Sequence, residues 1–515
     1  MRAIATADWG QVISPCGTGK SRMQVCELTQ TLVNADEQGS SAVVLVASHR
    51  LVLNKQLATQ VIDLVIKCGI PFDLLMVGSD RPDLIKLYHP DPAVGYGPLG
   101  FSPKVNRSIY SLNKKEIENF VARARNENRS VIIVSTYHSV ELLSDIGVID
   151  LANFDEAHNL TAKGFQEKLS AIKPNILRGY YYTATRKVAG DDEGMNDFAF
   201  YGNIIANIKP QVMLTRGEIA CPRIVLINSE NDETTNDTDL HMLVKNTIEG
   251  FVKHLIRVKN NSCQPDDIGA KIIIACDGVQ EMENIYQHAD LMNFARASGV
   301  RVFGISSKGG CHIDGQDIGS NRETFFKELN SLTDKENALI FNVNILCEGF
   351  DLPSITGAMP LKNLGLTRLM QLDGRANRLH RLDRERLYAG TLKPGDYANY
   401  VKPYGDLIIP THISSVDEHR RMVKYAKLFY SEFGIPPEEL IIRDDEYMVR
   451  KHQELPSTIP FDFKGGKDYN LTEEVISIIE DAKQEIKQDA KNEKTVQLRS
   501  ALDEMSVDDF KEMFK

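Results

Sequence analysis

The chain has 515 residues, which is more than one hydrophobic core usually holds, so two or three domains are expected. Hydrophobic residues make up 42% of it and charged residues 25%, which is the composition of a globular protein that folds in water. Its formal net charge of −11 disfavours a protein that binds nucleic acid mainly by neutralising phosphates. Any contact with nucleic acid would therefore be confined to a local groove.

The apolar residues and the cysteines indicate neither a membrane span nor a disulfide framework. The longest apolar runs, such as 42–47 and 131–134, have only the length of strands. Polar residues interrupt the N-terminal segment, which does not resemble a signal peptide. The eight cysteines include no C-x-x-C pair, which argues against a zinc site. We expect a soluble intracellular protein of the cytoplasm or nucleus, with no membrane partner.

In the first half of the chain, short β-rich runs alternate with helical stretches. Strands are predicted at 12–14, 43–47, 74–77, 131–136, 149–155 and 180–184, and helices at 21–33 and 51–67. This alternation is typical of a doubly wound parallel sheet. The Pro- and Gly-rich residues 88–105 are predicted to form a surface insertion or long loop.

A polar segment rich in Thr and Asn, 228–239, is expected to separate this half from a second α/β series. Strands of that series are predicted at 271–276, 300–306, 338–344, 355–360 and 406–410, and none after about Phe433. The charged C-terminal part is predicted to be helical, with one apolar face formed by Val475, Ile478, Ile479, Ala482 and Ile486. A last amphipathic unit begins at Ser506. The expected domains are 1–210, 211–430 (linker and second α/β domain) and 431–515.

The strongest local signal is a glycine-rich run between a predicted strand and a predicted helix. It reads Ser14-Pro15-Cys16-Gly17-Thr18-Gly19-Lys20-Ser21. Glycines let the backbone wrap around phosphates, with N–H groups and the helix N-terminus directed at them. Lys20 would reach the β- and γ-phosphates of ATP, and the Ser21 hydroxyl would bind Mg²⁺. We interpret the run as a P-loop, although Ser14 stands where the usual pattern has its first glycine.

Two adjacent carboxylates follow a predicted strand of the same domain, in the run Asp155-Glu156-Ala157-His158. The carboxyl end of a parallel strand is where ligands bind. Asp155 would hold Mg²⁺, and Glu156 would orient and deprotonate the attacking water. An exposed acidic pair at a helix start is the alternative, and the upstream P-loop makes it the less favoured one.

At this point the chain resembles the superfamily 2 helicases of the DExH (DEAH-box) type. The P-loop, Asp-Glu-Ala-His and then Thr183-Ala184-Thr185 occur in the order of that family. Residues 346–353 (LCEGFDLP) are similar to its fifth motif, and residues 371–378 (QLDGRANR) match its sixth, Q-x-x-G-R-x-x-R. The matched motifs run from Ser14 to Arg378. The resemblance implies two tandem RecA-like P-loop domains, here followed by a helical C-terminal extension, with ATP and Mg²⁺ as cofactors.

The same resemblance gives roles to residues of the second domain. An arginine supplied across a domain cleft stabilises the charge of the γ-phosphate transition state by roughly 10³-fold or more. Arg378 is the expected arginine finger, with Gln371 and Arg375 contacting phosphate and water. Gly349 and Asp351 of the fifth motif are expected at the nucleotide. Arg375 and Arg378 are predicted to lie three apart on one helix, where the alternative for Arg378 is an ordinary basic helix face.

Contacts with nucleic acid are expected from polar side chains that follow strands. Ser48 and Arg50 lie in a segment that resembles motif Ia, Thr136 in the motif that follows it, and Ser306 and Ser307 are their counterparts in the second domain. Hydroxyl groups bind phosphates without distinguishing between bases, which is what a motor that moves along nucleic acid requires. Each of these residues is equally interpretable as an ordinary strand-end cap.

The chain departs from the family pattern before the P-loop. Helicases of this group usually carry an aromatic–glutamine element there that recognises adenine, whereas only 13 residues precede Ser14 and Gln11 is too close to Lys20 for that role. Leu372 stands where many RNA helicases have arginine. With Thr183-Ala184-Thr185-Arg186, this resembles the DNA motors of type III restriction enzymes, phages and large DNA viruses.

We therefore expect an ATP-driven DNA helicase or translocase, whose C-terminal helices clamp nucleic acid or dock a protein partner. An RNA helicase is the nearest alternative. The other is an assembly subunit that does not unwind and in which ATP binding switches an interaction. Lys20, Glu156 and Arg378 argue against that alternative, since they form a complete hydrolytic set.

Overall fold

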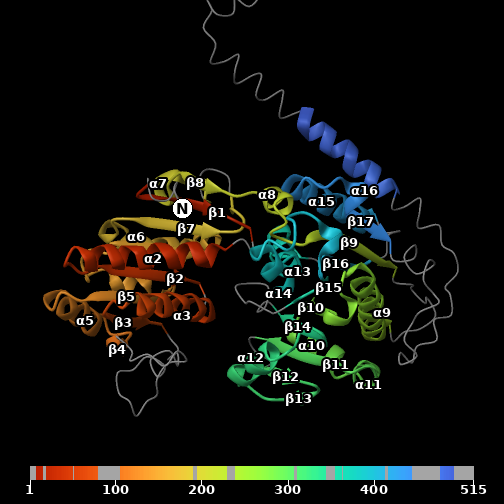
Figure 1. Cartoon of the computed structure of the whole chain (residues 1–515), viewed down its shortest axis with the longest axis horizontal. Helices are drawn as coiled ribbons and strands as arrows, with labels where there is room; N and C mark the ends of the chain where they lie inside the picture. The colour runs from red at the N-terminus through yellow and green to blue at the C-terminus, as the bar shows by residue number, and fades with distance from the viewer. Residues whose placement is uncertain are drawn as a thin grey trace, which may run out of the picture. The chain divides into compact units, whose positions relative to one another are not determined.

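The computed structural model describes residues 7–15, 19–49, 51–78, 105–188, 194–228, 238–306, 310–343, 354–361, 364–411, 416–443 and 476–491. The chain divides into two units, Met1–Pro210 and Gln211–Lys515 (Figure 1). Each unit is built around its own sheet.

The first unit contains an eight-stranded sheet in the order β4-β3-β5-β2-β6-β7-β1-β8, and its strands pair in parallel. The strands are β1 (Trp9–Ile13), β2 (Val43–Ser48), β3 (Phe72–Val77), β4 (Val105–Tyr110), β5 (Ser130–Thr136), β6 (Leu151–Asp155), β7 (Gly179–Thr183) and β8 (Ile204–Asn207). The inner strands are buried on both faces, which explains their continuous apolar sequence.

Helices cover both faces of this sheet (Figure 1). Helices α2 (Lys20–Glu37) and α3 (Leu51–Cys68) pack with Val44 and Val46 of β2 on one face. Helix α5 (Lys114–Asn126) packs with Val43 and Leu45 on the other, because successive strand side chains point to opposite faces. Shorter elements on the chain are η2 (Val140–Leu143), η3 (Ala157–Thr161), α6 (Lys163–Ile172), η4 (Lys173–Asn175) and α7 (Phe198–Tyr201).

The six strands predicted for this unit are all present, and the predicted doubly wound parallel sheet is confirmed. Two edge strands, β4 and β8, were not predicted. The predicted insertion at 88–105 lies outside the described residues except for Val105, which begins β4.

The second unit contains a nine-stranded sheet in the order β13-β12-β11-β14-β10-β15-β16-β9-β17. Its strands are β9 (Cys221–Asn228), β10 (Lys271–Ala275), β11 (Val300–Ser306), β12 (Cys311–Ile313), β13 (Gln316–Asp317), β14 (Asn337–Val343), β15 (Gly357–Pro360), β16 (Tyr404–Thr411) and β17 (Ile441–Arg443). At one edge, β12 pairs antiparallel with both β11 and β13, and the other pairs are parallel.

The helices of the second unit are α8 (Pro210–Thr215), α9 (Thr238–Asn261), α10 (Val279–Tyr286), α11 (Ala289–Ser298), α12 (Arg322–Asn330), α13 (Leu366–Ala376), α14 (Arg381–Tyr388), α15 (Val416–Phe433) and α16 (Pro437–Leu440), with short η6 (Pro265–Asp267) and η7 (Tyr397–Asn399). Helices α9, α10 and α11 share one hydrophobic core with strands β10 and β14. Helix α13 contacts β15 and β16.

Two expectations about this unit were wrong. Strand β9 precedes the polar segment 228–239, yet it pairs with β16 and β17 in the second sheet, so that segment does not divide the two sheets. Strands also do not stop at Phe433, because β17 adds an edge to the same sheet. Both errors have one cause: pairing partners far apart in the chain leave no local pattern in the sequence.

Residues 476–491 are helical, as predicted. Ile478 and Ala482 of the predicted apolar face are buried. On the polar side, Asp481 pairs with His419 at 2.8 Å, and Lys427 of α15 pairs with Glu485 at 2.9 Å and Asp489 at 2.7 Å. Val475 and the amphipathic unit from Ser506 lie outside the described residues.

Among the residues that the structure describes, no helix combines the length and the apolar character that crossing a membrane requires.

Candidate functional site

The polar residues of the P-loop and the acidic motif meet at one edge of the first sheet. Strand β7 lies between β1, which leads into the P-loop, and β6, which ends in Asp155. The registers place Ile13 beside Thr183, Tyr182 beside Asp155, and Asp155 beside Ser48. These residues are all at the carboxyl ends of parallel strands, where α/β sheets bind ligands.

The described part of the P-loop has the backbone that a phosphate loop needs. Gly19 has φ +91°, a left-handed conformation that strains any residue with a Cβ. Lys20 is the first residue of α2, and its Nζ donates to the Ser14 carbonyl at 3.1 Å. Ser21 is exposed in the first turn of that helix. Pro15 is described, whereas Cys16, Gly17 and Thr18 lie outside the described residues.

Asp155 is held in place by groups from two other elements. Gln24, one turn after Lys20 on α2, donates from Nε2 to Asp155 Oδ1 at 2.8 Å. The Tyr137 hydroxyl donates to the Asp155 carbonyl at 2.6 Å. Burial and the neighbouring Glu156 charge raise the pKa of Asp155 to about 6, while Lys20 and Gln24 act in the opposite direction. A buried carboxylate of this kind gains most from a cation.

Glu156 adopts a conformation that is rare for its residue type. Its φ is +52° and its ψ +48°, in the left-handed region, where it caps η3. Such a backbone costs a non-glycine residue on the order of 1 kcal/mol, and strain of this kind concentrates at functional sites. Asp155 is 9% and Glu156 5% exposed. The alternative of an exposed acidic pair is therefore wrong.

A hydrogen-bond network joins the acidic motif to the ends of two other strands. His158 Nδ1 lies 3.0 Å from the Thr183 hydroxyl and 3.5 Å from Glu156 Oε2. Asn159 Nδ2 lies 3.2 Å from His49 Nδ1, 3.2 Å from His158 Nε2 and 3.1 Å from the Glu156 carbonyl. An amide nitrogen carries two hydrogens, so it serves at most two of these three acceptors at once.

The residues of the sixth motif lie in the second unit, on and after α13. Gln371 and Arg375 are one turn apart on this helix and both are buried. The helix ends at Ala376 with Asn377 as its C-cap, so Arg378 lies beyond it. The prediction that Arg375 and Arg378 share one helix was wrong, and a basic helix face that continues through Arg378 is equally excluded, because a separate helix, α14, starts at Arg381.

Lys402 fixes the end of α13. Its Nζ donates to the carbonyls of Ala376 and Ile355, both at 2.7 Å. Burial lowers the pKa of Lys402 to about 7, and Arg378 is among the charges that lower it further. Ile355 follows the predicted fifth motif, whose residues, including Gly349 and Asp351, lie outside the described residues. Lys402 therefore ties the chain after that motif to the helix of the sixth.

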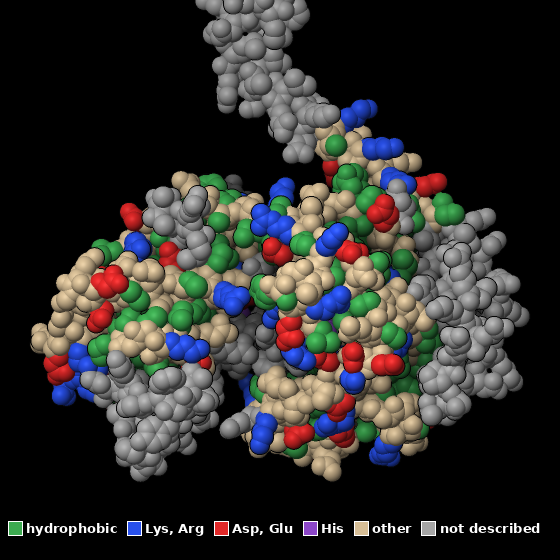
Figure 2. Space-filling model, viewed as in Figure 1, with side chains coloured by type: hydrophobic (Ala, Val, Ile, Leu, Met, Phe, Trp, Pro, Cys, Tyr) green, Lys and Arg blue, Asp and Glu red, His purple; other side chains and the backbone are tan. Residues whose placement is uncertain are grey.

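The residues predicted to contact nucleic acid are only partly described. Ser48, Thr136 and Ser306 end strands β2, β5 and β11 and are buried. The Thr136 hydroxyl is directed to Ser139 at 3.4 Å, which fits the alternative of a strand-end cap. Arg50 and Ser307 lie outside the described residues. On the face in Figure 2, acidic and basic side chains are interspersed over the described surface.

Several supporting residues were missed by the sequence analysis. Gln24 could have been found, because it lies one helical turn from Lys20 and therefore on the same face of α2. Asn159 and Lys402 carried no signal, since their partners are distant strand and helix ends. Gln11 is engaged inside the first unit, where it donates to the Met195 and Gly202 carbonyls and accepts from Arg186. Both ends of its side-chain amide thus have partners within this unit.

No family model and no curated protein matches the chain. Solved structures do resemble it. One is the ATP-dependent Type ISP restriction-modification enzyme LlaBIII bound to DNA, with a TM-score of 0.57 and 16% sequence identity. The match covers 87% of this chain and 31% of the LlaBIII chain. Another is a nuclease-deletion mutant of the Type ISP enzyme LlaGI in complex with a DNA substrate mimic, with a TM-score of 0.50 and 14% identity. That match covers 96% of this chain and 33% of the LlaGI chain.

A third similar structure is a point variant of S. cerevisiae Dbp5 bound to RNA and ADP BeF3, with a TM-score of 0.50 and 16% identity over 86% of this chain and 87% of that one. The chain spans about a third of the length of the two restriction enzymes and most of that of Dbp5. This likeness shows the fold, two tandem RecA-like α/β units, as the resemblance of the motifs implied.

Proposed function

We propose that this protein is a nucleic-acid-stimulated ATPase that moves on or remodels DNA. The observation that carries the proposal is the convergence of Lys20, Asp155 and the left-handed Glu156 at one sheet edge, with Asp155 oriented by Gln24. This is the set that phosphoryl transfer to water needs: a cation for the phosphates, a metal ligand and a general base. The superfamily 2 fold supports the same chemistry.

The donor set fits Mg²⁺ bound with ATP. Asp155 offers a buried carboxylate whose charge is destabilised by burial, and Ser21 offers a hydroxyl in the first turn of the same helix that carries Lys20. Hard oxygen ligands are those that Mg²⁺ prefers. The ion would neutralise charge that develops on the phosphates, while Glu156 would take the proton of the attacking water. Cys16 to Ser21 would supply backbone N–H groups to the phosphates, with Pro15, which has none, in the same loop.

Gln371, Arg375 and Arg378 are proposed to act on the same nucleotide from the second unit, with Arg378 as the arginine finger. A finger on a short segment after a helix moves with that unit, so hydrolysis would be coupled to domain movement. Gly349 and Asp351 keep their proposed place at the nucleotide. Ser48, Arg50, Thr136, Ser306 and Ser307 remain the proposed contacts with the phosphate backbone of nucleic acid.

DNA is proposed as the track because LlaBIII and LlaGI, two of the similar structures, are bound to DNA or a DNA mimic. RNA is the alternative, since Dbp5 in the same set is bound to RNA. Steady-state ATP hydrolysis with no nucleic acid, single-stranded DNA, duplex DNA or RNA distinguishes them. We expect the largest stimulation by DNA. Equal rates in all four conditions would refute a motor and favour an ATP-switched assembly subunit.

The base assignment is tested by Glu156→Gln, which keeps the size of the side chain and removes its basicity. We expect hydrolysis to fall by at least about 100-fold, within the range that general-base catalysis contributes, with ATP affinity retained. Arg378→Ala is expected to slow turnover with little change in nucleotide affinity, and Arg381→Ala, at the start of the next helix, serves as its control. Substantial hydrolysis by Glu156→Gln would contradict the assignment.

The helix at 476–491 is the proposed site of a protein partner. Its exposed residues are mainly charged, and its ion pairs with His419 and Lys427 attach it to the second unit. Removing the chain from residue 476 onward is expected to leave basal ATP hydrolysis unchanged and to abolish partner binding in a pull-down. Loss of basal hydrolysis would show instead that this helix supports the fold.

A further inference from the structure

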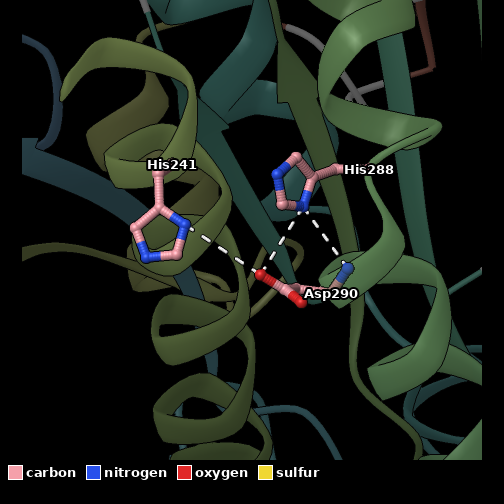
Figure 3. A group of neighbouring side chains, drawn as sticks. All are labelled: His241, His288 and Asp290. Carbon is pink, nitrogen blue, oxygen red and sulfur yellow. Dashed lines mark hydrogen bonds and ion pairs between the residues drawn. The ribbon is translucent and has the colours of Figure 1, made fainter. Parts of the chain in front are cut away.

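Two histidines and an aspartate meet on the second unit, and none of them belongs to a motif described above. His241 lies near the start of α9, His288 is the N-cap residue of α11, and Asp290 follows in the first turn of α11. One ligand atom from each side chain lies within 4.8 Å of the others. Figure 3 shows both imidazole rings facing the Asp290 carboxylate. Residues from two separate helices are thus brought to one point.

The spacing of these atoms is close to that of a metal site. Asp290 Oδ2 lies 3.9 Å from His241 Nδ1 and 3.7 Å from His288 Nδ1. Bonds of roughly 2.0–2.1 Å in tetrahedral geometry place ligand atoms about 3.3 Å apart. All three ligand atoms lie within 4.8 Å of one another, and the side chains of His241 and Asp290 are 68% and 59% exposed, so they can move closer together without disturbing the core.

The helices that carry the three side chains are packed on each other. Phe251 of α9 and Phe294 of α11 contact edge to face, with ring centroids 6.0 Å apart, inside the shared hydrophobic core. A ligand set on two packed helices needs little reordering to bind, which favours a site over a chance surface encounter.

The donor types select the ion. Two imidazole nitrogens and one carboxylate suit zinc and the other late first-row metals, whereas Mg²⁺ and Ca²⁺ prefer oxygen ligands. Three protein ligands leave one tetrahedral position for water.

The competing explanation is a helix cap with surface ion pairs, because His288 Nδ1 accepts the Asp290 N–H at 3.3 Å. Exposed ion pairs of this kind contribute only about 0–1 kcal/mol to stability.

We propose that His241, His288 and Asp290 bind one Zn²⁺ or a similar divalent transition-metal ion, which joins the start of α9 to α11. The proposal does not depend on the ATPase function. The His288 atom at this spacing is Nδ1, which also caps α11. Binding at Nδ1 replaces the cap by the metal bond.

The test uses the full-length chain without an affinity tag, stripped with chelator and kept in excess Mg²⁺ so that oxygen sites are filled. Calorimetric titration with Zn²⁺ compares the wild type with His241→Ala and Asp290→Asn. The matched control is His419→Ala, because His419 also pairs with an aspartate, Asp481, but has no third ligand among the described residues. Circular dichroism checks that each variant is folded.

We expect one Zn²⁺ site in the wild type and in His419→Ala, and an affinity at least about tenfold lower in His241→Ala and Asp290→Asn. Co²⁺ should give visible absorption bands of a four-coordinate site in the wild type and lose them in His241→Ala. Zn²⁺ should also raise the unfolding temperature of the wild type and of His419→Ala but not of His241→Ala, since it binds only the folded state. Equal Zn²⁺ affinity in the wild type and His241→Ala, or equal loss in His419→Ala, would overturn the proposal.

Discussion

The imidazole Nδ1 of His158 lies 3.0 Å from the hydroxyl oxygen of Thr183, and both side chains are buried. This bond joins the acidic motif after β6 to the end of the neighbouring strand β7. The same His158 nitrogen lies 3.5 Å from Glu156 Oε2, so the contact with Thr183 holds the imidazole beside the proposed general base.

Thr183→Val keeps the shape of the side chain and removes the hydroxyl. Since a buried imidazole nitrogen would lose its partner, we expect a destabilisation of about 1–3 kcal/mol and slower ATP hydrolysis. Unfolding in urea can be followed by fluorescence of Trp9, the single tryptophan, which contacts Tyr181 of β7 edge to face at 5.5 Å.

Thr185→Val is the matched control for this change. The Thr185 hydroxyl is buried and finds no hydrogen-bond partner within the part of the chain that the structure describes. Its removal should therefore be neutral or slightly stabilising. If the two valine variants behave alike, the His158–Thr183 bond has no role in orienting the motif.

Asp155→Asn should stabilise the nucleotide-free protein while it abolishes hydrolysis. Burial raises the pKa of Asp155 to about 6, above its unfolded value of roughly 3.9, so the folded state binds more protons between those pH values. Stability consequently falls as pH rises from about 4 to about 6, and above that range the full cost of the buried charge is present. Asparagine does not carry that cost.

Thermal unfolding without Mg²⁺ and nucleotide, at pH values from about 4 to about 8, measures this effect. We expect the unfolding temperature of Asp155→Asn to exceed that of the wild type by a few degrees above about pH 6, with the difference shrinking toward about pH 4. Asp36→Asn, an exposed position on α2, should show no such trend. A destabilised Asp155→Asn at the alkaline end would mean that the charge is better solvated than its burial indicates.

Asp406 is the centre of a buried ionic network in the second unit. It accepts from Arg223 at 3.0 and 2.8 Å, from Arg257 Nε at 3.1 Å, and lies 3.1 Å from His254 Nδ1. Despite burial, these groups hold the pKa of Asp406 well below its usual range. The network ties β16 to α9 and to β9, a strand of this sheet that was not predicted from the sequence.

Asp406→Asn would leave two buried guanidinium groups without their carboxylate, so we expect a loss of about 3–5 kcal/mol. The circular dichroism transition should shift to lower urea, whereas the Trp9 transition of the first unit should not. Asp314→Asn removes an exposed carboxylate 2.6 Å from Arg301. Its cost should stay under about 1 kcal/mol. Similar shifts for both variants would contradict the importance of burial.

The sequence predicted what depends on local pattern. Strands such as Val43–Ser48 are continuous apolar runs between polar turns, and the P-loop and acidic pair follow strands, so their place at the sheet edge could be expected. The left-handed backbone of Glu156 could not be predicted from the sequence, because no neighbouring residue type requires it.

The predictions that were wrong concern features that depend on contacts between residues far apart in the chain. Strand β9 joins the second sheet by pairing with residues 404–411 and 441–443. The sequence near Cys221 gives no indication of these distant partners. The end of α13 before Arg378 is set by Lys402 and by Asn377, whose carbonyl accepts from Ala220, rather than by a glycine or proline in the helix. A helix end that is fixed by tertiary contacts cannot be predicted from the hydrophobic periodicity of the sequence.

Lys402→Met tests whether the anchoring of α13 matters for the proposed arginine finger. Methionine keeps the length of the side chain and removes both hydrogen bonds to the Ala376 and Ile355 carbonyls. Because Arg378 follows this helix end closely, we expect turnover to fall several-fold with ATP affinity nearly unchanged. Lys393→Met, at an exposed position, is the control and should behave like the wild type.

The pH dependence of stability separates this role from a simple packing defect. Burial lowers the pKa of Lys402 to about 7, below its unfolded value of roughly 10.4, so between these values the unfolded chain binds the extra proton. Wild-type stability therefore gains a contribution that rises with pH from about 7 to about 10, and Lys402→Met lacks it. We expect the difference in unfolding free energy, wild type minus variant, to grow over that range, measured by urea unfolding at its two ends and its middle. A difference that stays constant would show that the lysine is charged in the folded protein throughout, and the carbonyls of Ala376 and Ile355 would then be binding a cation.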